Sequence, residues 1–327
     1  MSSIIPFIIS ALISGICSWV IFLYGPRWGL MDVANGRSSH CGAIPTGAGI
    51  GLPLACTFMG LYLSIPWIIW LPVVSVSLFS LVGDRVELSV KIRLIVQILC
   101  ALMICLGWFY PKGHTSILLL IFFIFFITGT ANIYNFMDGI NGIAGLTALL
   151  GFIFLGIWAV HHHLNPDFVL INIVLAGASA GFLVFNFPKA RVFMGDVGSI
   201  FIGFFFAVQI IQMSESISDF ICLASFLLPF YLDEVTTMAI RLKNRENITK
   251  AHRTHMYQLL ANELKIPQWK ITLGFALFQV LVGLIVFGVQ SKPVFFILGI
   301  DLFFLAAFIV TTFRIRQLAA HKKLEIR

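Results

Sequence analysis

Three aspartates stand beside glycine-rich or basic residues at the borders of long apolar runs. Asp84 lies in GDRVELSVKIR, Asp138 in NIYNFMDGING and Asp196 in NFPKARVFMGDVGSIFIGF. A charge inside a membrane costs roughly 3 kcal/mol at the centre of a helix. Two carboxylates about 4 Å apart repel by about 4 kcal/mol at an effective dielectric of 20, so they need a cation or a shared proton. The three clusters therefore predict one polar site at a membrane border.

The side chains in these clusters indicate a hard divalent cation. Carboxylate oxygens without thiolates suit Mg²⁺ or Mn²⁺. During phosphoryl transfer, such an ion is usually held by one or two carboxylates and by the phosphates of the substrate. Lys189 and Arg191, on the same segment as Asp196, could bind phosphate oxygens. The six cysteines form no C-x-x-C pair, so neither disulfides nor zinc are expected.

The composition excludes a water-soluble globule. The 327 residues are 59% hydrophobic and 11% charged, with a mean hydropathy of +1.00. A helix needs about 20 apolar residues to cross a membrane. The sequence predicts an all-α, polytopic transmembrane helical bundle that forms a single domain over residues 1–327. Eleven spans are expected, with ten as the alternative, near residues 4–24, 48–65, 67–82, 92–110, 116–131, 142–160, 168–185, 199–213, 219–240, 271–289 and 294–313.

The distribution of lysine and arginine predicts the orientation. Eleven alternating spans place nineteen of the 21 basic residues on one side, and only Lys112 and Lys292 on the side of the N-terminus. By the positive-inside rule, the N-terminus is outside and the C-terminus cytoplasmic. The net charge of +7 is then explained by topology and anionic lipids, and no nucleic acid partner is expected. The polar motifs all fall in cytoplasmic loops, near 25–47, 83–93, 132–141, 186–198 and 241–270.

Four motifs together resemble one enzyme family. RSSH at 37–40, NFMDGINGIAG at 135–145, NFPKARVFMGDVGS at 186–199 and HRTHMYQLL at 252–260 are similar to the polyprenyl-phosphate N-acetylhexosamine-1-phosphate transferases. This is glycosyltransferase family 4, related to phospho-N-acetylmuramoyl-pentapeptide transferase. The resemblance implies transfer of a sugar 1-phosphate from a UDP-activated N-acetyl sugar to undecaprenyl phosphate, with release of UMP. It also implies the bacterial inner membrane, an initiating step of O-antigen or other envelope glycan synthesis, and by analogy a possible homodimer.

The resemblance assigns roles to particular residues. Asp84, Asp138 and Asp196 are expected to be catalytic, with Asp196 as the main Mg²⁺ ligand and Asp138 as a second one. Asp84 is expected beside the lipid phosphate. The residues expected to bind substrate are Arg37, His40, Asn132, Asn135, Asn141, Lys189, Arg191, His252, Arg253 and His255.

Three positions depart from the family pattern. Gly83 stands where relatives have the first aspartate of a pair, and Asn141 replaces the second aspartate of DGLDG. The stretch at 45–49 reads PTGAG in place of PRGGG. The alternatives are therefore a catalytically impaired homologue or a polytopic lipid-pyrophosphate transporter. The sugar stays open among GlcNAc, FucNAc, QuiNAc and others.

Two acidic features lie outside these motifs. Asp233 and Glu234, near the end of the ninth span, either line the same cleft or have a structural role. Asp301 lies inside the last span, where a charge ordinarily indicates function. Because Asp301 falls outside the resemblance, we expect it to make a polar contact with another helix.

Overall fold

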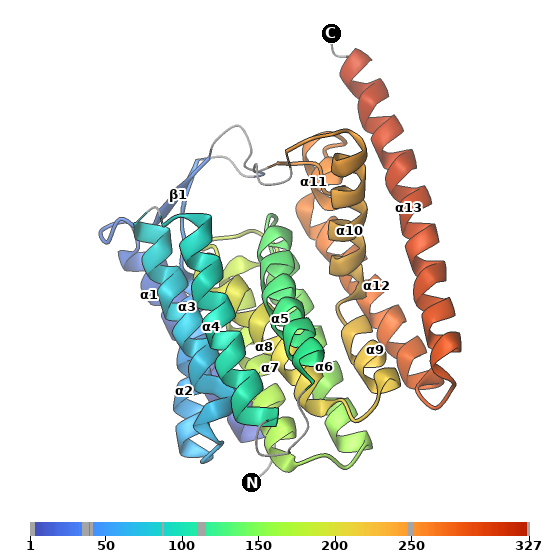
Figure 1. Cartoon of the computed structure of the whole chain (residues 1–327). Helices are drawn as coiled ribbons and strands as arrows, with labels where there is room; N and C mark the ends of the chain where they lie inside the picture. Colours follow the sequence, from blue (N-terminus) through green and yellow to red (C-terminus); the bar gives the residue numbers. More distant parts are fainter. Residues whose placement is uncertain are drawn as a thin grey trace.

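The computed structural model describes residues 4–34, 39, 42–86, 88–109, 116–247 and 252–325. Apart from a small hairpin, these residues form helices and their connections, which confirms the predicted helical class (Figure 1). In chain order, the elements are α1 (Ile4–Tyr24), β1 (Met31–Val33), β2 (Ala43–Pro45), the short 3₁₀ helix η1 (Ala48–Ile50), α2 (Gly51–Tyr62), α3 (Trp67–Arg85), α4 (Val90–Phe109), α5 (Ile117–Met137), α6 (Ile143–His161), α7 (Pro166–Asn186), α8 (Asp196–Met213), α9 (Ile217–Ser225), α10 (Leu228–Lys243), α11 (Met256–Asn262), α12 (Gln268–Val289) and α13 (Val294–Glu325).

Every predicted span coincides with helix, although not every helix has the length of a span. Among the described residues, eight helices are long and apolar enough to cross a membrane. The pair α9 and α10, bent by 85°, passes the same test when taken as one span and would make nine. The second and third predicted spans correspond to shorter apolar helices, Ala48–Tyr62 and Trp70–Gly83. The count of eleven therefore stays a prediction.

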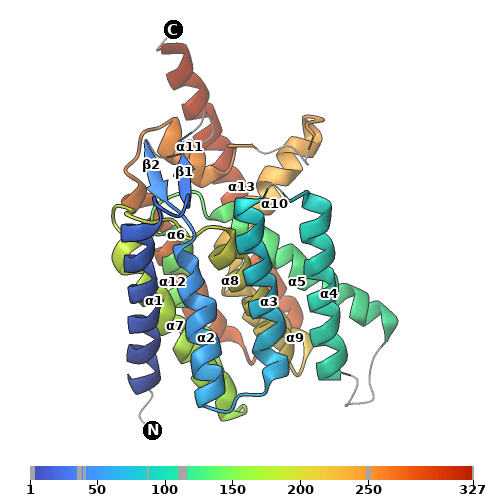
Figure 2. The same cartoon turned by 90° about the vertical axis from the view of Figure 1, so that its left-hand side faces the viewer.

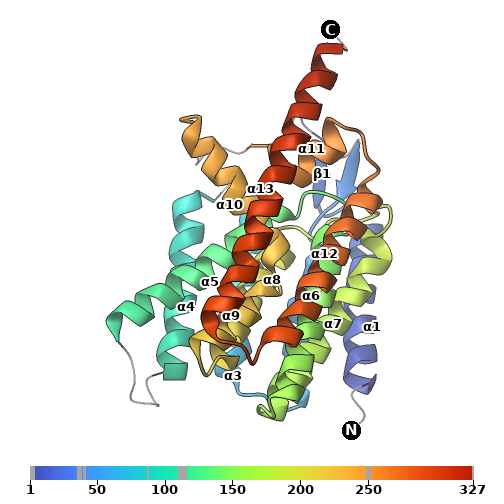
Figure 3. The same ribbon diagram turned by 90° about the vertical axis from the view of Figure 1, so that its right-hand side faces the viewer.

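Helix α8 forms the centre of the bundle. All its residues from Val197 to Met213 are buried, as expected for a helix that is apolar on every side. It packs against α3, α5, α6 and α9, and the two side views show it enclosed by these helices (Figures 2 and 3). Outer helices instead expose apolar side chains, such as Phe125 of α5 at 79%. These outward faces suit contact with lipid.

Small residues allow α1 and α7 to approach closely. A Cβ atom on Gly177 would collide with the carbonyl oxygen of Phe7, and one on Gly181 would collide with that of Ala11. Ser10 and Ser14, one turn apart on α1, are also fully buried. Interfaces of this kind are typical of helices that pack within membranes.

The two ends of the bundle differ in character. The described chain begins with α1 at one end and finishes with α13 at the other (Figure 1). The hairpin of β1 and β2 and the short helix α11 lie at the same end as the C-terminus (Figure 2). Strand β1 pairs with β2 in an antiparallel register that places Asp32 opposite Ile44.

Candidate active site

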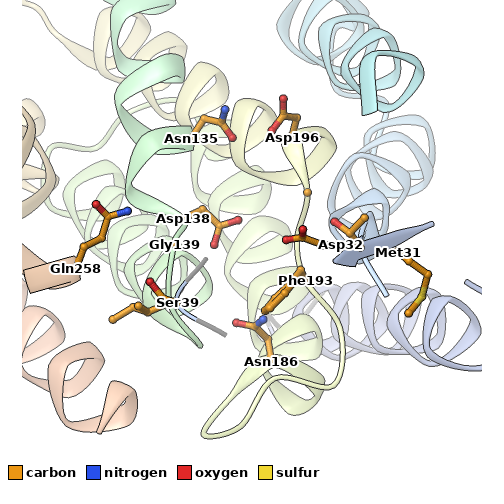
Figure 4. A pocket seen from close by; sticks show the side chains of 13 residues that line it. Met31, Asp32, Ser39, Asn135, Asp138, Gly139, Asn186, Phe193, Asp196 and Gln258 are labelled. Carbon is orange, nitrogen blue, oxygen red and sulfur yellow. The ribbon is translucent and has the colours of Figure 1, made fainter. Parts of the chain in front are cut away.

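A cavity of about 450 Å³ opens where α5 ends and α8 begins. Its walls come from β1, the α5–α6 turn, the 186–196 loop and α11, segments far apart in the sequence (Figure 4). The polar side chains that line it are Asp32, Ser39, Thr46, Asn135, Asp138, Asn186, Asp196 and Gln258. The cavity thus gathers carboxylates, amides and hydroxyls at one end of an apolar bundle.

Asp196 is the first residue of α8 and makes a strong ion pair. Gly195, with φ at 72°, turns the chain into the helix in a backbone conformation that favours glycine. Arg93 of α4 donates from Nη1 to Oδ2 of Asp196 at 2.6 Å. Ser199, one turn into α8, donates to Oδ1 of Asn135 at 2.6 Å. The start of α8 is therefore fixed to α5, and a cation lies beside its carboxylate.

Asp138 follows the last residue of α5 and enters the same cavity. Burial and, to a smaller extent, the negative charge of Asp196 together raise its pKa to about 7. Desolvation and a like charge both disfavour the ionised carboxylate. The structure therefore places two of the three predicted aspartates in the lining of one cavity.

The third aspartate, Asp84, lies in the last turn of α3, and its side chain is outside the described part of the structure. Helix α3 itself reaches the site, because Ser77 donates to the carbonyl oxygen of Val197 in α8 at 2.6 Å. Arg37 and His40 lie outside the described residues. Their predicted roles, like that of Asp84, stay predictions.

The other predicted residues divide between the cavity and its surroundings. Asn135 lines the cavity. Asn132, one turn earlier on α5, donates to Gln97 Oε1 at 2.7 Å, and the main chain of Asn141 is held by Gln268 and Thr272. Asn132 and Asn141 are not among the lining residues, so they support neighbours of the cavity in this arrangement.

Two basic residues that are predicted to bind substrate, Lys189 and Arg191, have exposed side chains on the loop before Asp196. Arg253 pairs with Glu263 at 3.3 Å. None of these three residues lines the cavity in the described structure. Their contacts with substrate stay predictions.

His252 and His255 lie behind the cavity rather than in its lining. Burial is the main cause that lowers the pKa of His252 to about 4, and the nearby Arg241 acts in the same direction. At neutral pH, His252 is therefore uncharged. His255 is 2% exposed, and its two ring nitrogens lie 3.5 Å from Asp233 Oδ1 and from Glu234 Oε2.

Several residues at the site were not assigned from the sequence. In the sequence analysis, Arg93 contributes only to the count of basic residues that predicts the orientation in the membrane. Its place in the first turn of a predicted span could have indicated a role at the site. Asp32 belongs to a hairpin with no alternating pattern strong enough to predict it. Asn186 is the first residue of the motif at 186–199. Its side chain accepts a hydrogen bond from the Gly142 amide at 2.7 Å and donates one to the Val192 carbonyl oxygen at 2.8 Å. Asn186 thereby ties the α5–α6 turn to the loop that carries Asp196.

The hairpin is fixed to that loop through backbone groups. Phe193 donates to the Pro45 carbonyl at 2.7 Å, and Ala48 and Gly49 donate to the carbonyls of Phe193 and Met194 at 3.0 and 2.9 Å. Figure 4 shows Asp32 entering from β1 and Asp138 from the end of α5. The stretch 45–49 therefore acts as a backbone bridge between Asp32 and Asp196.

The two acidic features outside the motifs also have their places. Asp301 accepts from Ser225 at 3.0 Å, which confirms the expected contact with another helix. Asp233 is fully buried and does not line the cavity. It accepts from the amides of Met256 and Tyr257. Of the two interpretations of Asp233, as a residue that lines the cleft or as a residue with a structural role, the second is correct.

Comparison with known proteins gives a consistent family. The family model described as glycosyl transferase family 4 matches residues 66–214, a range that includes Asp84, Arg93, Asp138 and Asp196. A probable undecaprenyl-phosphate N-acetylglucosaminyl 1-phosphate transferase of Bacillus subtilis is 25% identical over 79% of this chain and 76% of its own length.

Two further relatives match over shorter stretches. The decaprenyl-phosphate N-acetylglucosaminephosphotransferase of Mycolicibacterium smegmatis is 30% identical over 38% of this chain and 34% of the relative. A phospho-N-acetylmuramoyl-pentapeptide-transferase of Leuconostoc citreum is 43% identical over 18% of each chain. The chain thus spans three quarters of the Bacillus relative but less than a fifth of the Leuconostoc one. The family match and these relatives together show that the chain is similar to glycosyl transferase family 4, most clearly over residues 66–214.

Proposed function

We propose that this protein transfers an N-acetylhexosamine 1-phosphate from a UDP-sugar to undecaprenyl phosphate and releases UMP. The observation that carries the proposal is the cavity in which Asp138 and Asp196 meet, with Arg93 bound to Asp196, at the end of an apolar bundle. A lipid phosphate at the membrane border and a water-soluble nucleotide sugar can both reach such a place. The names of the Bacillus and Mycolicibacterium relatives support the same class of reaction.

The residues at the cavity fit Mg²⁺ or Mn²⁺. Asp138 and Asp196 supply carboxylate oxygens and Asn135 an amide oxygen, and no imidazole or thiol is among the lining residues. Within the described residues, no group of three histidine, cysteine, aspartate or glutamate side chains forms a ready-made metal site. Mg²⁺ does not require such a group, because it usually binds one or two carboxylates and completes its shell with water and substrate phosphates. A bound cation would offset the burial and the negative charge of Asp196 that raise the pKa of Asp138.

In the proposed reaction, an oxygen of the lipid phosphate bonds to the sugar-bearing phosphorus of the UDP-sugar. The bond from that phosphorus to the bridging oxygen breaks, and its electron pair leaves with UMP. A phosphate monoester has its second pKa near 6, so the attacking oxygen needs no strong base at neutral pH. When bound, the divalent cation would neutralise charge on the pyrophosphate.

The chain's own side chains then have separate tasks. Asp138 and Asp196 would hold the cation, and Arg93 lies where it can share the charge of Asp196 and of a phosphate oxygen. Asn135 and Ser199 keep the start of α8 in place. Asp32 enters from the opposite wall (Figure 4), where a carboxylate can accept hydrogen bonds from sugar or ribose hydroxyls.

The position of the cavity favours an enzyme over a transporter. A transporter is expected to bind its substrate near the middle of the membrane, between two similar halves. Here the cavity is lined from β1 and α11, which lie at one end of the bundle (Figure 1). We place that end in the cytoplasm, at the inner membrane of a bacterium, because nineteen of 21 basic residues fall on that side of the predicted topology. The pathway would be an initiating step of O-antigen or other envelope glycan synthesis.

Gly83 supports a second candidate, a catalytically impaired homologue. A Cβ atom at this position would meet Leu88 and Arg93 only at ordinary contact distances of 3.6 and 3.8 Å. The site therefore accepts a Cβ atom without a clash with described residues. A variant Gly83→Asp tests whether the missing carboxylate limits the rate.

The deciding experiment measures UMP release by the purified protein in detergent with undecaprenyl phosphate and Mg²⁺. UDP-GlcNAc is the first donor, because two relatives are named for N-acetylglucosamine, followed by UDP-FucNAc and UDP-QuiNAc. Release that requires lipid and metal, and that Asp196→Asn abolishes, supports the transferase and names its sugar. If folded protein binds Mg²⁺ but releases no UMP with any donor, and Gly83→Asp also releases none, the proposal is wrong.

A further inference from the structure

A buried carboxylate on α10 carries several contacts that the proposed reaction does not use. Asp233 is fully buried, on a helix that does not line the cavity. Its Oδ1 accepts from the amide of Met256 at 2.8 Å, and its Oδ2 accepts from the amide of Tyr257 at 3.3 Å. These amides open α11, where the first helical N–H groups have no partner within the helix. One side chain of α10 thus anchors the beginning of α11.

Helix α11 connects this anchor to the cavity. The hydroxyl of Tyr257 donates to the carbonyl oxygen of Phe136 at 2.9 Å, two residues before Asp138. Gly139 lies so close to Tyr257 that a Cβ atom on the glycine would collide with the phenol. The next residue, Gln258, lines the cavity itself. A displacement of α11 would therefore move both the turn that bears Asp138 and one wall of the cavity.

The protonation of the connecting phenol is well defined. Burial, followed by the negative charges of Asp233 and Asp138, raises the pKa of Tyr257 well above its usual value. The hydroxyl therefore keeps its proton and can donate to Phe136. His255 stacks on the Tyr257 ring, with 5.5 Å between ring centroids, and its ring nitrogens face Asp233 and Glu234. The imidazole fills the space between the anchor and the phenol.

We propose that Asp233 is a positioning residue that holds Asp138 and Gln258 in place for catalysis through α11 and Tyr257. The inference rests on the transferase function proposed above. It also gives His255 a supporting place in the same link, behind the cavity. Because buried amides without partners are costly, removing one oxygen of Asp233 should release the start of α11 rather than leave it in place.

The first test is the kinetics of Asp233→Asn, which keeps the shape of the side chain but turns one acceptor into a donor. Small displacements of positioned groups can cost about 100-fold in rate, so we expect kcat to fall by about that factor. The KM for the UDP-sugar should rise about tenfold, while the KM for undecaprenyl phosphate stays within about twofold. A loss of folded protein alone would lower the apparent kcat and leave both KM values unchanged, and that result would overturn the proposal.

Two further variants sharpen the comparison. Tyr257→Phe keeps the ring and removes only the hydrogen bond to Phe136, so it should shift the same two parameters in the same direction by a smaller factor. It serves as the test if Asp233→Asn does not fold. Asp301→Asn is the matched control, because Asp301 is another helix-borne carboxyl whose contact is with Ser225 on α9. Wild-type kinetics for Tyr257→Phe, or equal losses in the control, would contradict the link.

Hydrogen–deuterium exchange gives a measurement that does not depend on activity. In Asp233→Asn, peptides covering residues 252–262 and 136–142 should exchange at least about tenfold faster, while peptides of α7 keep their wild-type rate. Uniformly faster exchange would mean general destabilisation, and unchanged exchange in 136–142 would mean that no link exists. Either result overturns the proposal. If the wild type shows no transferase activity but the exchange pattern appears, the proposed function fails and the positioning contact stands.

Discussion

At the scale of single residues, Arg93 supplies the positive charge that pairs with Asp196 in the proposed site. It donates to Asp196 at 2.6 Å from a half-buried position. Removing one donor that stabilises developing charge typically costs about 10² to 10³ in rate. Arg93→Gln should therefore lower the kcat of UMP release by about 100-fold.

The matched control for this change is Arg314→Gln, an exposed arginine on α13. Its rate should stay within about twofold of the wild type, since surface substitutions of this kind have small effects. If Arg93→Gln keeps a third or more of the wild-type kcat, the ion pair with Asp196 is structural. The phosphate-binding role of Arg93 would then be wrong.

His252 predicts a pH dependence of stability rather than of chemistry. Its pKa is lowered from 6.5 to about 4 by burial and by nearby positive charges. Between these two values the unfolded chain binds more protons than the folded one, so stability falls as the pH is lowered. The melting temperature in detergent should drop between pH 7.5 and pH 5. For His252→Gln, the drop should be about 2 °C smaller, and an equal drop in both proteins would exclude His252 as its source.

At the scale of elements, a close contact between backbone atoms joins the 45–49 stretch to α8. A Cβ atom on Gly49 would collide with the Cα and N of Gly198 and with the Met194 carbonyl oxygen, all of them backbone atoms that cannot turn away. Gly49→Ala should therefore cost about 1–3 kcal/mol and lower the activity, because the hairpin with Asp32 must move away from Asp196. Thermal unfolding and UMP release check the two effects.

Gly129→Ala is the control for that substitution. Gly129 lies inside α5, and nothing stands within 4 Å of its added Cβ atom. In a helix, alanine is favoured over glycine by about 0.5–1 kcal/mol, so this variant should be as stable as the wild type or slightly more so. Equal behaviour of the two variants would show that the Gly49 contact does not matter.

The helices were predictable because apolar runs are long and local, whereas the site depends on contacts between distant residues. The sequence predicts one span over residues 219–240 and does not indicate the bend between α9 and α10. Leu228-Pro229 begins the second helix, and Ser225 at the end of the first is bound to Asp301. Strands β1 and β2 have three residues each and no periodic signal. Their place is set by the backbone of Phe193 and Met194.

The same reasoning explains which site residues were found. Asp138 and Asp196 could be predicted, because charges beside apolar runs are costly enough to need a use. The sequence assigns Gln258 no role of its own, because it is only one residue of the motif at 252–260. Its place at the cavity follows from the anchoring of α11 by Asp233 on α10. Such contacts between separate segments leave no trace in composition or spacing.

At the scale of the whole molecule, the proposed function requires the cavity to face the compartment that contains UDP-sugars. The α8–α9 connection lies at the opposite end of the bundle from β1 and α11 (Figure 3). Ser216 of that connection and Asn244, just after α10, are both exposed. A cysteine at either position therefore reports which end of the bundle faces the outside.

The native cysteines of the described structure should contribute little to the labelling. Of the cysteines in the described part of the chain, Cys56, Cys100, Cys105 and Cys222 are buried and Cys17 is half-buried. Cys41 lies outside the described residues, so the experiment uses a background variant in which Cys41 is replaced by serine. A membrane-impermeant maleimide should then label Ser216→Cys in intact bacteria, and Asn244→Cys only after the cells are opened.

This expectation follows from charge rather than from the fold. Basic residues remain on the cytoplasmic side during insertion, and the predicted topology of eleven spans places nineteen of 21 on the side of the loops that carry Asp138 and Asp196. Labelling of Asn244→Cys in intact cells would place Asp138, Asp196 and Arg93 outside, away from the pool of nucleotide sugars. The transferase function could not operate in that orientation. Labelling of both positions in intact cells would show that the bend between α9 and α10 does not complete a crossing, so the cavity would need another assignment of sides.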